Sequence, residues 1–204
     1  MNDLLNNLSN RVWITRGCRF NAQRRMEIND KCTNLSISVL SVIIIAINLL
    51  VFLPYFNNGN IITIITVSLS VFVLSISQFV YARDYKIKAQ NYHKCGCELS
   101  EILDKIEILK MKESIQGDEI SNLYKEYEKV IISYNENHSD IDYEIFRAMN
   151  RKDKSNNPKD NRFQLSLGKV CWIKLKWYTT LYFKYVFLDL ILPTASVFAV
   201  FCLK

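Results

Sequence analysis

The chain has 204 residues, of which 50% are hydrophobic and 23% are charged, and its formal net charge is +6 at pH 7. The mean hydropathy is close to zero because apolar stretches are averaged with charge-rich ones. Five glycines leave little material for a glycine-rich phosphate loop. A charge of +6 can indicate nucleic-acid binding, but the placement of the basic residues is more informative than their sum.

The first segment, residues 1–32, is basic and amphipathic. Its apolar side chains fall on one side of a helix over residues 3–31: Leu4, Leu5, Leu8, Val12 and Trp13. Such a helix can lie along the inner leaflet, where anionic lipid attracts basic segments. It can equally continue directly into the apolar run that follows, and the sequence leaves both interpretations open.

No charged side chain occurs from Thr33 to Ala82. Pro54 and the stretch Asn57–Asn60 interrupt this run, and each half is close to the roughly 20 residues that span a bilayer. A soluble core helix of this length would present a charged face, which neither half has. We therefore predict a transmembrane hairpin over residues 33–82.

Basic residues flank the hairpin on both sides. Residues 1–32 carry six Lys and Arg against three Asp and Glu, residues 83–88 are again basic, and the hairpin loop is uncharged. Because Lys and Arg stay on the cytoplasmic side, both ends are predicted to face the cytoplasm of a bacterial inner membrane. No signal peptide is expected, since the apolar block begins late and lacks a cleavage-type site.

Small polar residues form a stripe on each predicted span. The candidates are Asn34, Ser38, Ser41 and Asn48 in the first span and Thr63, Thr66, Ser70 and Ser77 in the second. Such residues commonly pack spans together. Alternatively, an oligomer turns the stripes inward to line a water-filled path, since intramembrane polar groups avoid lipid and one hairpin cannot enclose a pore.

After the hairpin we predict a cytoplasmic helical-hairpin body over residues 83–150. One helix is expected from Arg83 to about Ser114, with Gly117 as a C-terminal stop and Asp118 as the N-cap of the next helix. Apolar residues spaced by three and four define a candidate interface: Tyr92, Leu99, Ile102, Ile106, Leu109, Leu123, Tyr127 and Val130. This seam is short, so it needs a partner helix from the same chain or a neighbouring subunit.

No catalytic set and no cofactor site emerge. Cys95 and Cys97 lie beside His93, but structural zinc usually needs a second spaced pair, which the sequence lacks, so we predict no metal and an ordinary helix interface. The acidic surroundings of His138 are assigned to capping of a helix by Ser139 or Asp140. The six cysteines fall in segments where thiols stay reduced, so no disulfide framework is expected.

The C-terminal part divides into a mobile loop over residues 151–163 and an interfacial segment with a third membrane helix over residues 164–204. The interfacial segment is basic and aromatic: Lys169, Trp172, Lys174, Lys176, Trp177 and Tyr178. Asp189 is the sole charge in the apolar stretch 185–203. It is assigned either to an ion pair with an inner-flank cation or to oligomer contacts or gating.

Several short motifs surround the hairpin in a recognisable order. Arg24-Arg25 precede it, Tyr81–Tyr85, Ala89–Tyr92 and Cys95 follow it, and Tyr127–Tyr134 leads into Glu136–Tyr143. This order resembles the SLATT domains, two-transmembrane effectors of bacterial anti-phage systems. The stretch Glu136–Tyr143 is most like the branch found beside reverse transcriptases in retron-type operons. A third apolar segment exceeds the two spans of that family.

The resemblance implies an all-α, membrane-damaging effector without catalytic residues that acts by self-association as a pore. It would be held inactive by operon partners, a reverse transcriptase with its msDNA, and released on infection to kill or arrest the cell. Membrane lipids are the other partner, and direct nucleic-acid contact stays open. The residues alone also allow a membrane-anchored adaptor or a small constitutive ion channel.

Overall fold

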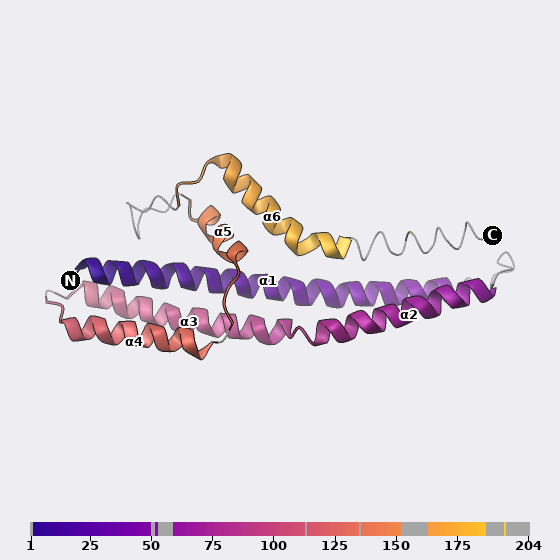
Figure 1. The fold of residues 1–204 in the computed structure, drawn as a ribbon, viewed down its shortest axis with the longest axis horizontal. Coiled ribbons are helices and arrows are strands. Elements are labelled where there is room, and N and C mark those ends of the chain that lie inside the picture. Colours follow the sequence, from indigo (N-terminus) through magenta and orange to yellow (C-terminus); the bar gives the residue numbers. More distant parts are fainter. Residues whose placement is uncertain are drawn as a thin grey trace. The chain divides into compact units, whose positions relative to one another are not determined.

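The computed structural model describes residues 2–49, 52, 59–112, 114–134, 136–151, 163–186 and 194. The helices follow in the order α1 (Asn2–Leu49), α2 (Gly59–Tyr81), α3 (Tyr85–Lys110), α4 (Gly117–Ser133), α5 (Asp140–Met149) and α6 (Leu167–Val186) (Figure 1). No strand occurs in the part of the chain that the structure describes. The predicted all-α class is confirmed.

The chain divides into two compact units, which are described separately below. The first, which we name the body, comprises Met1–Glu27 and Lys86–Trp177. The second, which we name the hairpin unit, comprises Ile28–Tyr85 and Tyr178–Lys204.

The core of the body is built by the start of α1 together with α3 and α4, which run side by side in Figure 1. Leu5, Leu8 and Val12 of α1 are at most 1% exposed and pack in the same cluster as the apolar residues of α3 and α4. The apolar side of the N-terminal segment is therefore used inside the body, and α1 continues to Leu49 without a break. This arrangement favours the continuing helix over a segment lying in the leaflet.

All residues of the candidate interface except Tyr92 belong to this core cluster. The candidate residues are all buried, with exposed fractions between 0% and 8%: Tyr92, Leu99, Ile102, Ile106, Leu109, Leu123, Tyr127 and Val130. Burial of one face at a spacing of three and four is what an amphipathic helix needs. In the structure the partner helix for the seam comes from the same chain, because α1 packs against it.

The turn between α3 and α4 differs from the prediction. α3 ends at Lys110 rather than near Ser114, and α4 begins at Gly117, so Gly117 is neither a helix stop nor left-handed. The N-cap is Gln116, not Asp118. The Glu119 carboxylate accepts from the Gln116 backbone N–H at 3.1 Å. This contact satisfies one of the N–H groups that a helix start leaves without a partner.

The helix predicted from Arg83 also begins later than expected. α2 ends at Tyr81 and α3 begins at Tyr85. Between them the Arg83 N–H bonds the Val80 carbonyl at 3.0 Å, and Asp84 adopts a left-handed φ of 50°. Aspartate tolerates this region better than most residues because its short polar side chain can bond locally. α2 thus ends before Asp84, whose left-handed conformation keeps α2 and α3 from forming one continuous helix.

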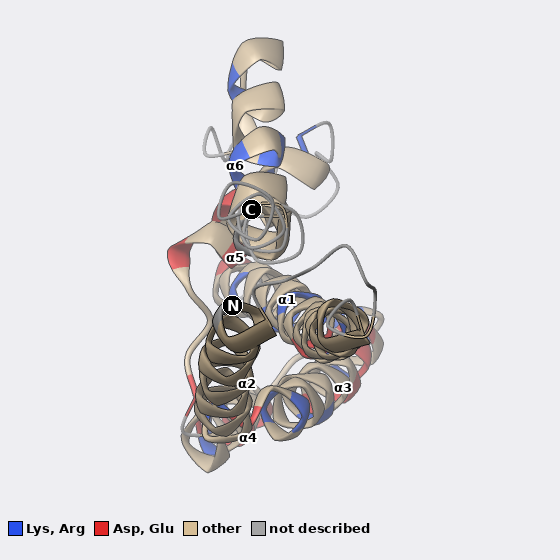
Figure 2. Cartoon of the chain, turned by 90° about the vertical axis from the view of Figure 1, so that its right-hand side faces the viewer, with Lys and Arg blue, Asp and Glu red and all other residues tan. Residues whose placement is uncertain are grey.

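The hairpin unit contains apolar helical segments that bury little of their surface. Two helices in the described residues, one in α1 and one beginning at Ile62, are long and apolar enough to cross a membrane. Only 22% and 17% of their most apolar stretches are buried, which is far below the burial of a soluble core helix. α2 contains no Lys, Arg, Asp or Glu, so its ribbon is tan in Figure 2, where basic residues are blue and acidic residues are red. The two segments meet through two small clusters: Leu40, Ile44 and Val73, and Ile47 and Ile62.

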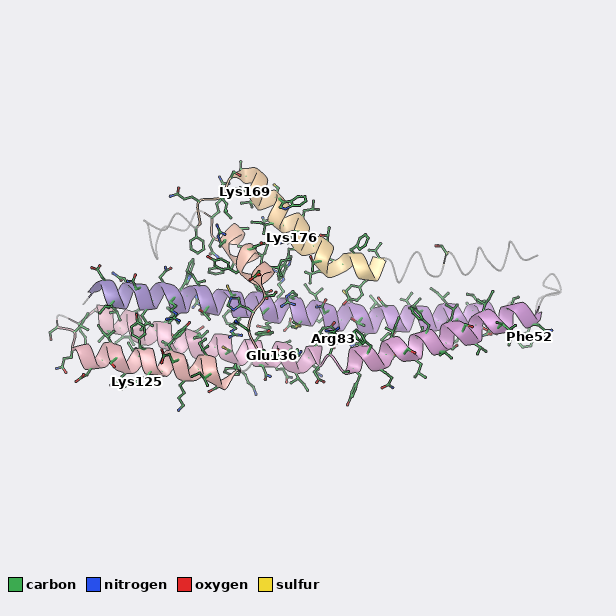
Figure 3. The ribbon with its side chains drawn as sticks, in the orientation of Figure 1. Phe52, Arg83, Lys125, Glu136, Lys169 and Lys176 are labelled. Atoms are coloured by element: carbon green, nitrogen blue, oxygen red, sulfur yellow. The ribbon has the colours of Figure 1, made fainter. Side chains whose placement is uncertain are left out.

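α6 contributes to both units. In the body, Trp177 is buried whereas Trp172 is 66% exposed, and Lys176, labelled in Figure 3, forms an ion pair with Glu144 at 2.8 Å. In the hairpin unit, the Tyr185 hydroxyl donates to the Asn29 carbonyl at 3.1 Å. Tyr185 thus belongs to a helix that begins at Leu167 and does not start a new one. Asp189 lies outside the described residues.

Candidate functional site

The serine and threonine hydroxyls of the polar stripes bond to their own helices. Each reaches the carbonyl four residues earlier, at distances between 2.8 and 3.0 Å: Ser38, Ser41, Thr63, Thr66, Ser70 and Ser77. This back-bonding meets their need for an acceptor inside an apolar environment. The hydroxyls of the stripes can therefore lie in lipid without requiring hydrogen bonds between the two helices.

One pair joins the two stripes. Thr66, which is 1% exposed, donates from its hydroxyl to the side-chain oxygen of Asn48 at 2.8 Å. Residues three, four and seven apart share a helix face, so Thr63 and Ser70 lie along the same side of α2 as Thr66. Ser41 lies two turns from Asn48 on α1. The two stripes consequently adjoin at the Asn48–Thr66 pair.

Most of the stripe remains on the outside of the hairpin unit. Ser41 and Ser77 are half-buried, whereas the others except Thr66 are exposed: Asn34, Ser38, Asn48, Thr63 and Ser70. We name all eight stripe residues, whether exposed, half-buried or buried, the polar face. Thr66 serves packing within the hairpin, and the exposed members are available to a second molecule or to water.

The body contains a second polar arrangement, centred on a fully buried carboxylate. Asp142 of α5 is 0% exposed and accepts from Arg25 of α1 twice, at 2.9 Å from Nε and 2.9 Å from Nη2. Its Oδ2 also accepts from the Ser139 backbone N–H at 2.9 Å and the Ser139 hydroxyl at 3.1 Å. Asn21 donates to the Asp142 carbonyl at 3.1 Å. We name these four residues the Asp142 cluster.

Ser139 is the N-cap of α5, which confirms one of the two caps expected from the sequence. Asp142 completes the capping box from the third helical position. The carboxylate therefore has two tasks, because it caps its own helix and binds a cation on another one.

The segment between α4 and α5 is held by backbone contacts. The carbonyl of Glu136, a residue labelled in Figure 3, accepts from Arg19 of α1, and the carbonyl of Asn137 accepts from the Tyr92 hydroxyl at 2.9 Å. The Arg19 guanidinium also lies 5.7 Å from the centre of the Tyr92 ring. These contacts fix the segment that leads into α5 against α1 and α3.

An aromatic contact lies beside the Asp142 cluster. Phe146 of α5 packs on Gly17, where an added Cβ would come within 2.0 Å of the Phe146 ring. The ring centres of Trp13 and Phe146 are 4.7 Å apart in an edge-on arrangement, and Phe163 completes the group. We name Trp13, Gly17, Phe146 and Phe163 the aromatic notch. Only glycine permits this approach of the ring to the α1 backbone.

The titratable groups of the body are poorly suited to nucleophilic chemistry. Burial and the nearby Asp142 carboxylate raise the pKa of the Cys18 thiol to about 12, and burial raises the pKa of Cys95. A thiol must ionise to act as a nucleophile. Burial and the Arg19 guanidinium lower the pKa of His138, whose Nδ1 has no hydrogen-bond partner.

His93 contacts a cysteine thiol but belongs to no candidate metal site in the described residues. Its Nε2 is 3.7 Å from the Cys97 sulfur, and its Nδ1 is 3.1 Å from the Gln23 side-chain oxygen. Cys95 points into the core instead. Within the described ranges no group of three or more possible metal-binding side chains occurs.

Sequence reasoning missed the Asp142 cluster and the aromatic notch. Two signals were present. Ser139 and Asp142 have the spacing of a capping box, which marks a helix start. Gly17 is the sole glycine in α1, and an isolated glycine in a helix often marks a close approach by another group. Neither signal indicates which residue of a distant segment contacts Asp142 or Gly17.

Comparison with known proteins gives one match. No curated protein and no solved structure matches the chain. The sequence model of the SMODS and SLOG-associating 2TM effector domain family 5 matches residues 1–200. The two apolar helical segments agree with the two transmembrane helices in that description. The chain is therefore a membrane protein and belongs to the SMODS and SLOG-associating two-transmembrane effector domain family 5.

Proposed function

We propose that this chain is the toxic effector of a bacterial anti-phage system and permeabilises the inner membrane once its partners release it. Family membership supports the coarser part of this statement, a membrane effector role in anti-phage defence. Killing or arrest of the infected cell, which is abortive infection, would follow from collapse of the ion gradients.

The polar face of the hairpin unit is the observation that carries permeabilisation. It places exposed Asn48, Thr63 and Ser70 on segments whose other outward side chains are mostly apolar, although Ser68 and Ser75 of α2 are exposed as well. Polar groups avoid lipid, so this face gains by meeting the same face of another copy. Two spans cannot enclose a path, whereas several copies can. Self-association is therefore the step that creates the pore.

The inhibitory partner that we propose is a reverse transcriptase with its msDNA. The support is the resemblance of Glu136–Tyr143 to the reverse-transcriptase-associated branch, and this stretch contains Ser139 and Asp142 of the Asp142 cluster. Arg19 and Arg25, two basic residues of the N-terminal segment, are engaged within the body. These two arginines are therefore not available to phosphate, whereas Arg11 and Arg24 of the same segment are exposed.

The test compares the chain expressed alone with the chain expressed together with its genomic neighbours. The proposal expects growth arrest, uptake of a DNA-binding dye and depolarisation only when the neighbours are absent or infection occurs. An adaptor would leave growth and the membrane unaffected in both cases. A constitutive channel would depolarise the membrane whether or not the neighbours are present, and either result contradicts the proposal. Co-purification from the same cells identifies the neighbour that binds.

A further inference from the structure

The contacts that join α5 to α1 are few and lie outside the main core of the body. They include the Arg25–Asp142 ion pair, the Asn21 bond to the Asp142 carbonyl, and the packing of Phe146 on Gly17, Cys18 and Trp13. Phe146 belongs to a small cluster with Cys18 and Phe163, which is distinct from the cluster of α1, α3 and α4 but shares the partly buried Trp13 with it. α5 can therefore leave α1 while the main core stays intact.

The docked arrangement is specific, but it leaves nearby polar groups unsatisfied. Arg19 is 2% exposed, and its buried Nε has no hydrogen-bond partner. The buried Nδ1 atom of His138 has no hydrogen-bond partner either. Unsatisfied buried groups oppose the state that contains them. A buried ion pair adds little net stability, although it selects one arrangement over others. These features are typical of an element with two states rather than of a permanent core contact.

The contacts also depend on one another. Without Asp142, Arg25 loses both of its carboxylate bonds and α5 loses its capping box. Without Gly17, the Phe146 ring cannot keep its close approach to α1. Removal of either residue therefore opposes the docked arrangement.

We propose that the docking of α5 on α1 is an intramolecular latch that keeps the effector inactive, and that its opening is the conformational step of release. The latch rests on the proposed function, because permeabilisation is the activity that it restrains. Arg19 and Tyr92 hold the segment before α5, so that α5 stays near its docking site after it opens.

Two native cysteines report on the latch without any substitution. Cys18 lies in the small cluster with Phe146 and Cys95 lies in the main core, and both are 0% exposed. Opening of the latch exposes Cys18 alone, whereas unfolding of the body exposes both. Cells are treated with N-ethylmaleimide, and the modification of each cysteine is quantified by mass spectrometry of its peptide. We expect both thiols to be protected with the neighbours present, and Cys18 alone to react when dye uptake begins.

A variant can open the latch in the presence of the neighbours. Gly17→Ala places a methyl group 2.0 Å from the Phe146 ring and should raise the labelling rate of Cys18 by about an order of magnitude or more, with dye uptake before infection. Gly168→Ala is the matched control, since a Cβ at that position in α6 meets nothing within 4 Å. It should behave like the wild type.

The possible outcomes distinguish a failure of the latch from a failure of the proposed function. Cys18 that stays protected while the wild-type membrane opens overturns the latch. So does a Gly17→Ala chain that exposes Cys18 alone yet leaves the membrane closed until infection. If Gly17→Ala exposes Cys95 as well, the body has unfolded, and Asp142→Asn decides by the same two readouts. A wild-type chain that admits no dye without its neighbours contradicts the proposed function instead.

Discussion

Arg25 and Asp142 are 117 positions apart in the sequence and form a two-point ion pair, with Nε–Oδ1 and Nη2–Oδ2 distances of 2.9 Å each. Parallel bonds of this kind fix the orientation of both groups as well as their distance. Because the same carboxylate caps α5, the start of that helix and its attachment to α1 depend on one side chain. The predictions below begin with this pair.

Loss of the cation should destabilise the body strongly. Arg25→Met leaves the Asp142 carboxylate without its cation, which costs about 3–5 kcal/mol in the free energy of unfolding as long as α5 stays docked. Chemical denaturation of the detergent-purified chain measures this loss. Lys105→Met is the control, because the Lys105–Glu126 pair is largely exposed and such pairs contribute about 0–1 kcal/mol. Equal effects of the two substitutions would contradict the assigned role of Arg25.

Neighbouring positions on α3 should respond in opposite ways to a carboxylate. Ile106 is 0% exposed, so Ile106→Asp buries an unpaired charge and costs several kcal/mol, enough to unfold the body and abolish assembly with partners. Ile108 is 63% exposed, and Ile108→Asp should leave folding unchanged. Limited proteolysis and co-purification with the genomic neighbours check both variants. Normal complex formation by Ile106→Asp would show that the seam is not part of the core.

The polar face should be required for permeabilisation but not for membrane insertion. Replacing Ser41 and Asn48 together with leucine favours insertion and removes polar groups that could stabilise water in an oligomer. We expect normal insertion, normal inhibition by partners, and loss of dye uptake and killing after release. Oligomer size and permeability are measured on the same double variant. An intact oligomer that still admits dye would remove these residues from the pore lining.

Two further variants separate pore lining from packing. Thr66→Val breaks the 2.8 Å bond to Asn48 inside the hairpin but leaves the Asn48 amide in place. It should retain permeabilisation if the polar face lines a path and lose it if the stripes only pack the spans. The double variant Ser68→Leu and Ser75→Leu alters exposed serines outside the stripes and should behave like the wild type.

The body should become less stable in mildly acidic solution. Burial and the Arg19 guanidinium lower the pKa of His138 below 6.5, while the carboxylates of Asp142 and Asp140 oppose this shift. The unfolded chain therefore takes up a proton near pH 6.5, before the folded chain does, so the free energy of unfolding falls as the pH drops below that value. His138→Gln should flatten this dependence between about pH 7 and pH 5.

The orientation can be tested with one added and one native cysteine. Asn58→Cys lies in the hairpin loop, which the positive flanks place outside the cytoplasm. A membrane-impermeant maleimide should label it in intact spheroplasts. The exposed native Cys97 should react only after permeabilisation. The reverse pattern would show that the topology is inverted.

The spans and the core seam could be predicted because their signals are local. An uninterrupted lack of charge from Thr33 to Ala82 is sufficient to exclude a soluble helix of that length. The spacing of Leu99, Ile102 and Ile106 by three and four specifies a buried face whatever covers it. What covers it is a long-range property, and the sequence left open whether α1 or a second subunit does so.

The errors came from residues whose conformation depends on a particular contact. Glycine often follows the end of a helix, which is why the sequence predicts Gly117 as a helix stop. The Glu119 carboxylate instead accepts from the Gln116 backbone N–H, and Gly117 is the first helical residue. Asp84 adopts a left-handed conformation, which is uncommon outside glycine even though aspartate tolerates it better than most residues. The partnership of Arg25 with Asp142 joins distant segments, and no spacing rule connects them.

Gly17 is unfavourable for the helix that contains it, but the packing of Phe146 on α1 requires it. Alanine at this position would favour the helical state of α1 by about 1 kcal/mol, because glycine has more backbone freedom to lose. In the whole chain the same methyl group collides with the Phe146 ring. Such a conflict between local and tertiary demands is called frustration, and natural sequences retain little of it. A library of isolated α1 peptides selected for helix content should discard Gly17, whereas a library selected in the full-length chain should keep it.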